Sequence, residues 1–242
     1  MKYNNIIITL ILVFTFSCKQ KETTKDTETE IGTESKMLVT HYYSVKMENG
    51  IAVKDSLKDC FSCNQAEVYD RNGKQTELRF YKSNMTDMYG YEVYNFNNEG
   101  HKTGSKYFEG DSLTTIYTYD LDNEGRILKG MAFNAITDEP LYGYINEYDK
   151  NGNHISTGSL NSKEEVIDYY KRTFNDNGIV VLENIVDLEG NPIFKVKYEY
   201  RPQADDNWTE QLTYYNDELK EIRYREEIMI KGEKTLPNNG DK

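Results

Sequence analysis

The stretch NEYDKNGN at residues 146–153 decides the fold, because it joins an alternating aromatic segment to a tight turn that ends on glycine. Related turns read VYDRNGK (68–74), YNFNNEGHK (94–102), YDLDNEGR (119–126) and TFNDNGI (173–179). Their glycines are Gly73, Gly100, Gly125, Gly152 and Gly178, at separations of 27, 25, 27 and 26 residues. A nearly constant period indicates one supersecondary unit copied several times.

The segments that flank these turns alternate with a period of two. Tyr117 and Tyr119 precede one turn, and Tyr142 and Tyr144 precede the next. This alternation of aromatic residues predicts β-strands. Asp and Asn in the turns can accept hydrogen bonds from their own backbone, and Gly tolerates a positive φ. A second, weaker turn such as TDEP (137–140) falls between glycine turns, so each period holds two strands and two turns.

The sequence therefore predicts an all-β fold of tandem antiparallel β-hairpin repeats, forming an elongated open meander sheet or a short solenoid. The repeat domain is expected to span residues 38–233. Its units are expected to turn near Gly50, Gly73, Gly100, Gly125, Gly152 and Gly178.

The first residues have the pattern of an exported protein. Lys2 precedes an apolar run that is too short for a membrane-spanning helix of about 20 residues, so residues 1–17 are predicted to be a signal peptide. The segment TFSC (15–18) resembles a bacterial lipobox, which predicts lipidation of Cys18; ordinary secretion with cleavage elsewhere is the alternative. Residues 18–37 are then a lipidated cysteine with a disordered tether, and residues 234–242 a disordered tail.

Charge narrows the choice of partners. The chain has 41 acidic and 29 basic residues, a net charge of −12. Nucleic-acid binding requires a basic face, so nucleic acid is not an expected partner. The expected location is the cell envelope, with the chain anchored to the outer membrane through its N-terminal lipid and its orientation, periplasmic or surface, left open.

Two cysteines remain after Cys18, in the sequence CFSC at Cys60 and Cys63. In an oxidising compartment this pair either closes as a structural disulfide or stays as two thiols. Catalytic redox chemistry would need a helix N-terminus that lowers a thiol pKa, whereas these residues lead directly into a predicted strand.

The turns are rich in acids and amides but lack the spacing of a calcium loop. Such a loop needs Glu at position 12, where loops starting at Asp120 and Asn95 place Met131 and Lys106. The three histidines form no spaced pair, and no GxSxG motif is present. We therefore expect no metal, no cofactor and no enzymatic activity.

Two repeat families resemble this chain. YTYDLDNEGR (117–126) and NEYDKNGN (146–153) resemble the YD (RHS-type) repeat of bacterial cell-surface proteins, and GHKTGSKYFEG (100–110) is similar to a MORN-type hairpin repeat. Tyr198 and Trp208 match the terminal unit of small exported proteins of this type, whereas Arg201 and Asp206 depart from it. The resemblance implies stacked hairpins in a lipoprotein of Gram-negative bacteria, with no cofactor.

The aromatic surplus of 21 Tyr, 9 Phe and 1 Trp suggests where binding occurs. Packing within the sheet explains part of it, and exposed rings would form a binding face. The expected face consists of Tyr117, Tyr119, Tyr142, Tyr144, Tyr198 and Trp208. The predicted function is an envelope lipoprotein that binds a protein or a glycan. The alternatives are an immunity or antitoxin-like protein that neutralises a secreted toxin, and a thiol-redox protein acting through Cys60 and Cys63.

Overall fold

The computed structural model describes residues 34–201 and 208–231. This part of the chain forms fifteen strands in a single sheet. The strands are β1 (Glu34–Glu48), β2 (Ile51–Leu57), β3 (Gln65–Tyr69), β4 (Gln75–Tyr81), β5 (Met88–Phe96), β6 (Lys102–Glu109), β7 (Ser112–Leu121), β8 (Ile127–Asn134), β9 (Pro140–Tyr148), β10 (His154–Leu160), β11 (Val166–Phe174), β12 (Val180–Val186), β13 (Pro192–Arg201), β14 (Glu210–Tyr215) and β15 (Glu218–Lys231).

The glycine turns form as their composition predicts. In the turn after β3, Asp70 Oδ1 accepts the N–H groups of Asn72 and Lys74, both at 2.9 Å. The Gly73 N–H donates to the Asp70 carbonyl at 2.9 Å, and Gly73 has φ 77°. The left-handed φ is readily adopted only by glycine, and the extra residue shifts the register between Val68 and Tyr69. The same arrangement recurs at the other glycine turns, which accounts for the period.

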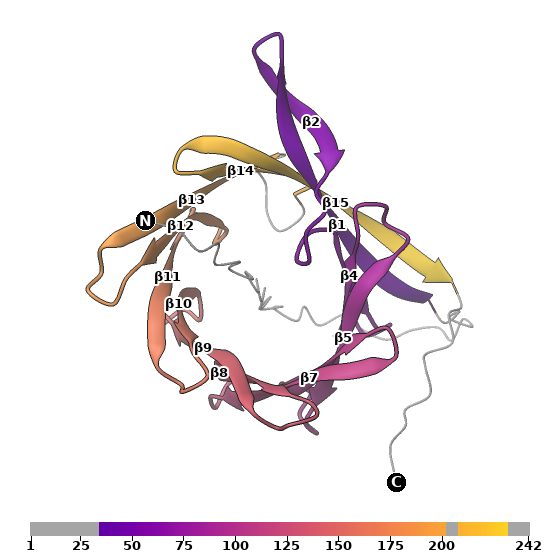
Figure 1. The fold of residues 1–242 in the computed structure, drawn as a ribbon, viewed down its shortest axis with the longest axis vertical. Helices are drawn as coiled ribbons and strands as arrows, with labels where there is room; N and C mark the ends of the chain where they lie inside the picture. Colours follow the sequence, from indigo (N-terminus) through magenta and orange to yellow (C-terminus); the bar gives the residue numbers. More distant parts are fainter. Residues whose placement is uncertain (1–33, 202–207, 232–242) are drawn as a thin grey trace, which may run out of the picture.

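The sheet closes on itself, so the predicted open meander sheet or short solenoid of tandem repeats is wrong. Sequential strands pair from β3 to β15, and β15 then pairs with β1 from Glu34↔Lys231 to Ser44↔Glu221. All strands except β2 thus form a closed, fourteen-stranded antiparallel barrel, seen as a ring in Figure 1. Closure pairs the two edges that an open array would expose to other chains.

Strand β1 has two neighbours on one edge. Its first half pairs with β3, and its second half pairs with β2. The β1–β2 hairpin consequently projects beyond the ring, at the top of Figure 1. Strand β1 also starts at Glu34, earlier than the predicted domain boundary at residue 38.

The two rims of the barrel carry different turns. The glycine turns lie on the rim where β1 begins and β15 ends, because Lys36 at the start of β1 pairs with Tyr69 beside the first of these turns. We call it the terminal rim. The opposite rim carries the weaker turns and the Cys60–Cys63 loop, and we call it the disulfide rim.

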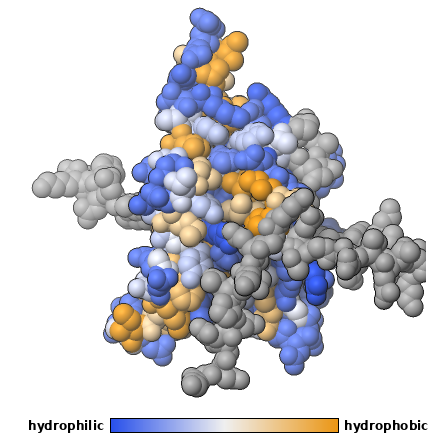
Figure 2. Space-filling view, turned by 90° about the vertical axis from the view of Figure 1, so that its right-hand side faces the viewer, coloured by the Kyte–Doolittle hydropathy of each residue, from blue (hydrophilic) through white to orange (hydrophobic). Residues whose placement is uncertain are grey.

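Each strand sends alternate side chains to the inner and outer wall. Directly paired residues point to the same side, so the pairs Glu92↔Tyr107 and Tyr94↔Ser105 share one face. This face is the inner one, because Glu92 on β5 interacts electrostatically with Tyr144 on β9, four strands away. The outer wall carries exposed charges on many strands, among them Lys106, Glu147, Lys171 and Lys197. Figure 2 shows the resulting mixture of hydrophilic and hydrophobic surface.

Candidate binding site on the inner wall of the barrel

Five of the six aromatic residues predicted to form a binding face lie on the inner wall of the barrel. The strand registers place Tyr117, Tyr119, Tyr142, Tyr144 and Tyr198 on the same inner face. Eight further tyrosines of the described residues lie on the same inner face: Tyr42, Tyr69, Tyr94, Tyr107, Tyr148, Tyr170, Tyr200 and Tyr215.

Two of the predicted residues are separated from the others. Tyr198 belongs to a buried cluster with Tyr200, Ile179 and Val196. The Trp208 ring lies 5.7 Å from the Tyr200 ring, and the Arg225 guanidinium stacks over its indole at 4.3 Å. Tyr198 and Tyr200 also line a cavity of about 390 Å³ beside the turn at 175–179. The structure therefore divides the predicted face into two groups.

The larger group is built around a pair of tyrosines from β7 and β9. The hydroxyls of Tyr117 and Tyr142 are 2.8 Å apart, and the rings meet edge to face with centroids 6.4 Å apart. Tyr142 is 39% exposed, so this pair is open to solvent. The neighbouring Tyr144 ring covers Gly130, where any Cβ would overlap it.

A carboxylate, Glu92, lies within electrostatic reach of this pair and accepts hydrogen bonds from hydroxyl groups. Ser105 Oγ donates to Glu92 Oε1 at 2.5 Å, and the Tyr119 hydroxyl lies 3.3 Å from the same oxygen. Burial raises the pKa of Glu92, and Ser105, Lys102 and Tyr119 lower it by less. Burial and then Glu92 raise the pKa of Tyr144 well above its ordinary value. The hydroxyls of these tyrosines are accordingly neutral hydrogen-bonding groups.

A second carboxylate, Glu67, lies nearby on β3. It accepts the Tyr69 hydroxyl, and burial raises its pKa. Arg225 and Lys102 lie within electrostatic reach of Glu67. The Lys102 Nζ donates to Gln75 Oε1 at 2.9 Å and lies 3.6 Å from the centroid of the Tyr94 ring. Burial lowers the pKa of Lys102 to about 8, although Glu92 and Glu67 oppose the shift.

On the other side of the inner wall the charges are paired. The Arg172 guanidinium bonds Glu183 at 2.8 Å, and the Tyr198 hydroxyl donates to the same carboxylate at 2.6 Å. Arg172 also contacts Thr157 Oγ1 at 3.0 Å and His154 Nε2 at 3.1 Å. This network links the inner faces of four strands, β10 to β13, and uses the Arg172 guanidinium in several hydrogen bonds.

His154 makes the stability of the fold depend on pH. Burial, and then the charge of Arg172, lower its pKa from 6.5 to about 4. The folded state therefore binds fewer protons than the unfolded state between these values, and stability falls as the pH drops from 6.5 to 4. We expect a loss of about 2 kcal/mol from this group. Urea unfolding at pH 7.5 and 4.5 should show a smaller pH effect for His154→Gln than for the wild type. Equal pH effects in the two proteins would contradict this assignment.

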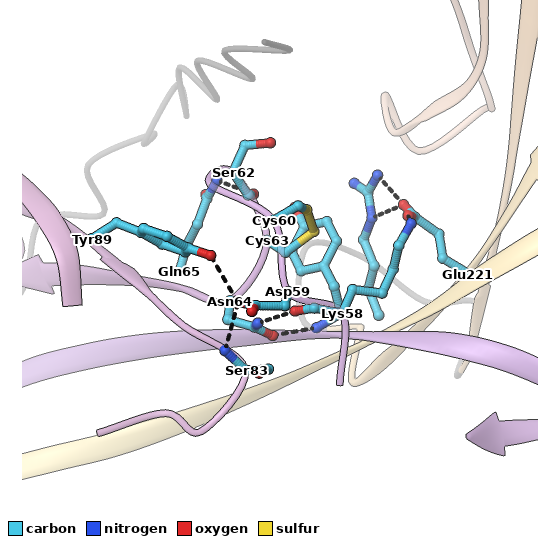
Figure 3. Close-up of a disulfide and its surroundings, with 12 residues drawn as sticks. Lys58, Asp59, Cys60, Ser62, Cys63, Asn64, Gln65, Ser83, Tyr89 and Glu221 are labelled. Atoms are coloured by element: carbon cyan, nitrogen blue, oxygen red, sulfur yellow. Dashed lines mark hydrogen bonds and ion pairs between the residues drawn. A yellow bond between two sulfur atoms is a disulfide. The ribbon is translucent and has the colours of Figure 1, made fainter. Parts of the chain in front are cut away.

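Cys60 and Cys63 are joined as a disulfide in a loop between β2 and β3 (Figure 3). Asp59 accepts the Tyr89 hydroxyl at 2.8 Å and the Ser83 N–H at 3.3 Å, which ties the loop to the start of β5. The loop follows a strand and precedes a strand. It therefore lacks the helix N-terminus that activates redox cysteines.

The disulfide loop also reaches the inner wall. The Phe61 ring stacks on Phe80 at 5.2 Å and meets Tyr107 at 5.7 Å. At the end of the loop, Asn64 is fully buried; its Oδ1 accepts the Tyr42 N–H and its Nδ2 donates to the Lys58 carbonyl. The loop is therefore a structural element of the disulfide rim.

Several inner-wall groups have polar atoms without a hydrogen-bond partner. They are Tyr107 and Tyr144 through their hydroxyls, Asp168 through Oδ1, Gln211 through Oε1 and Thr213 through Oγ1. Buried polar groups are rarely left unpaired, so these atoms mark places where water or a ligand would bind.

Sequence reasoning missed the charged part of this site. Glu92 follows Tyr91 in the run YEVYNF, and the alternation alone does not tell which of the two points inward. Glu92 lies two residues before Tyr94, and residues at this spacing share one face of a strand, so the sequence could have placed Glu92 on the same face as Tyr94. Among residues 34–201 and 208–231, no group of His, Cys, Asp and Glu is arranged to hold a metal ion. In the same ranges, no helix is both long enough and apolar enough to cross a bilayer.

The comparisons with known proteins found a solved structure with some similarity to this chain, but no related family. The chain matches no protein-family model and no curated protein. A porin-like protein from Bacteroides uniformis is similar to it at a TM-score of 0.40 and 9% sequence identity, over 82% of this chain and 96% of that one.

Proposed function

We propose that this chain is a non-enzymatic protein of the cell envelope that binds a glycan against the tyrosines of its inner wall. The observation that carries the proposal is the Tyr117–Tyr142 pair, which is open to solvent and lies beside Glu92. Sugar rings present C–H groups that pack on aromatic faces, and hydroxyls that bond carboxylates and phenols. The tyrosine rings of the inner wall and the unpartnered hydroxyls of Tyr107 and Tyr144 offer both kinds of contact.

The proposed location in the cell envelope is consistent with glycan binding. The signal peptide and the lipidated Cys18 fall outside the described residues and stay predictions from the sequence. Exposed charges recur around the outer wall, which suits contact with water, since lipid-facing barrel walls carry an apolar band. We propose an anchored barrel whose terminal rim lies nearest the lipid, because β1 begins there.

Calorimetry with three tetrasaccharides of matched length tests the proposal: cellotetraose, its fully N-acetylated amino-sugar analogue and its fully deacetylated analogue. We expect at least one to bind, and Tyr142→Ala to weaken that binding at least tenfold. Tyr169→Ala is the matched control, because Tyr169 lies on the outer wall opposite Gly158. Absence of binding by all three, or equal losses in both variants, would reject a glycan site on the inner wall.

A further inference from the structure

We infer that the inner wall recognises a cationic group, a primary ammonium of the kind carried by a deacetylated amino sugar, at Glu92 and Glu67. This inference rests on the proposed function and specifies the chemistry of its ligand. The glutamates in the middle of the inner wall differ in how their charges are compensated.

These glutamates fall into two groups. Glu183 is paired with Arg172, and Glu221 bonds Arg223 at 2.6 Å and Lys58 at 2.9 Å. Glu67 and Glu92 have no ion pair among the described residues and accept hydrogen bonds from hydroxyl groups. Arg225 lies within electrostatic reach of Glu67, but its guanidinium stacks over the Trp208 indole and donates to the Trp208 carbonyl at 3.2 Å. The wall therefore has one side on which carboxylates are in direct contact with cations, and another on which the cations lie farther from the carboxylates.

Lys102 does not neutralise Glu67 and Glu92 by direct contact. Its Nζ is bonded to Gln75 and lies over the Tyr94 ring, so one lysine is shared by two carboxylates without contacting either. Burial raises the pKa of both Glu67 and Glu92, as expected where compensating cations are too few. A cation bound there would lower both pKa values.

The aromatic surroundings favour an organic cation. Tyr94, Tyr119 and Tyr144 lie within electrostatic reach of Glu92 and of one another. Ammonium groups are attracted to such ring faces, and the effect grows when water is excluded. Lys102 already uses the Tyr94 ring in this way, which shows the kind of contact that this wall makes.

Unpaired hydroxyls provide the remaining contacts. Tyr107 is 6% exposed and its hydroxyl has no partner, although it lies within electrostatic reach of Glu92. The Tyr144 hydroxyl is also unpartnered. An ammonium has three donors and no acceptor, so carboxylate and phenol oxygens are suitable partners for it. An acetamido group is neutral and bulkier, and would lose the charge-assisted bonds.

The three tetrasaccharides separate this inference from the proposed function. We expect the deacetylated amino-sugar tetramer to bind the wild type at least tenfold more tightly than cellotetraose or the N-acetylated tetramer. Glu92→Gln keeps the shape of the side chain and should bring the three affinities to within about twofold of one another. Glu147→Gln, on the outer wall, removes the same charge and should leave the preference unchanged.

Three results would overturn the inference: no preference for the deacetylated tetramer in the wild type, an intact preference in Glu92→Gln, or equal binding of trilysine. If cellotetraose still binds in the first case, a glycan site stands without cation recognition. If no tetramer binds, the proposed function itself fails. Should Glu92→Gln not fold, as judged by its thermal melt, Glu67→Gln serves as the second variant with the same expected loss of preference.

Discussion

Replacing Arg223 with Met is expected to lower the free energy of unfolding by about 3–5 kcal/mol, the largest single-residue effect that the structure predicts. Arg223 and Glu221 are 5% and 2% exposed. Arg223 donates to Glu221 Oε1 through Nε at 2.9 Å and through a terminal nitrogen at 2.6 Å, and its guanidinium stacks over Tyr42 at 4.5 Å. Removing it leaves a buried carboxylate with only Lys58 as a counter-ion.

The free energy of unfolding of Arg223→Met, measured as a function of pH, should show that the loss comes from the charge of Glu221. Burial raises the pKa of Glu221, but Arg223 and then Lys58 outweigh it, so the pKa lies below its ordinary value. A carboxyl with a lowered pKa stabilises the fold at neutral pH, and this contribution is lost as the pH falls through the folded pKa. The difference in the free energy of unfolding between the wild type and Arg223→Met should therefore become smaller in acid, because a protonated Glu221 needs no cation.

A double variant provides the control. Changing both Arg223 and Glu221 to Met removes the charge together with its partner, and should recover a large part of the lost stability. Urea unfolding of the two single variants and the double variant measures the coupling between the residues. A loss below about 1 kcal/mol in Arg223→Met, or additive losses in the double variant, would contradict a buried ion pair.

Closure of the barrel predicts a near-complete cross-link between two strands that lie far apart in the sequence. Val39 on β1 and Glu226 on β15 are direct partners in the register. Facing residues of antiparallel strands have Cα atoms about 4.5–5.5 Å apart, which suits a disulfide. Val39→Cys with Glu226→Cys should oxidise almost fully in a Cys18→Ala background, detected by thiol counting and peptide mapping.

The same experiment distinguishes the barrel from an open sheet. In an open array β1 and β15 would lie at opposite ends, and these cysteines would remain reduced. Val39→Cys with Lys106→Cys is the control, because β6 is several strands away from β1 in the barrel as well. Free thiols at positions 39 and 226 after oxidation would be evidence against closure.

Local features of the fold were readable from the sequence. The Asp or Asn that opens each glycine turn, and the glycine that ends it, interact only within five residues, so their geometry follows from local chemistry. The strands Met88–Phe96 and Pro140–Tyr148 likewise follow from the two-residue alternation around them. The same alternation places Tyr117, Tyr119, Tyr142 and Tyr144 on one face of their strands, and their role in binding stays a prediction.

The sequence by itself determined an all-β chain of hairpins with a fixed period, because turn chemistry and alternation act over a few residues. Only the tertiary structure decided that the sheet closes, since closure depends on twist summed over fourteen strands and on one pairing between chain ends. Closure also decided which face is inside. Period-two alternation is the same for both faces of a strand, so the inward position of Glu92 beside Tyr144 could follow only from the ring.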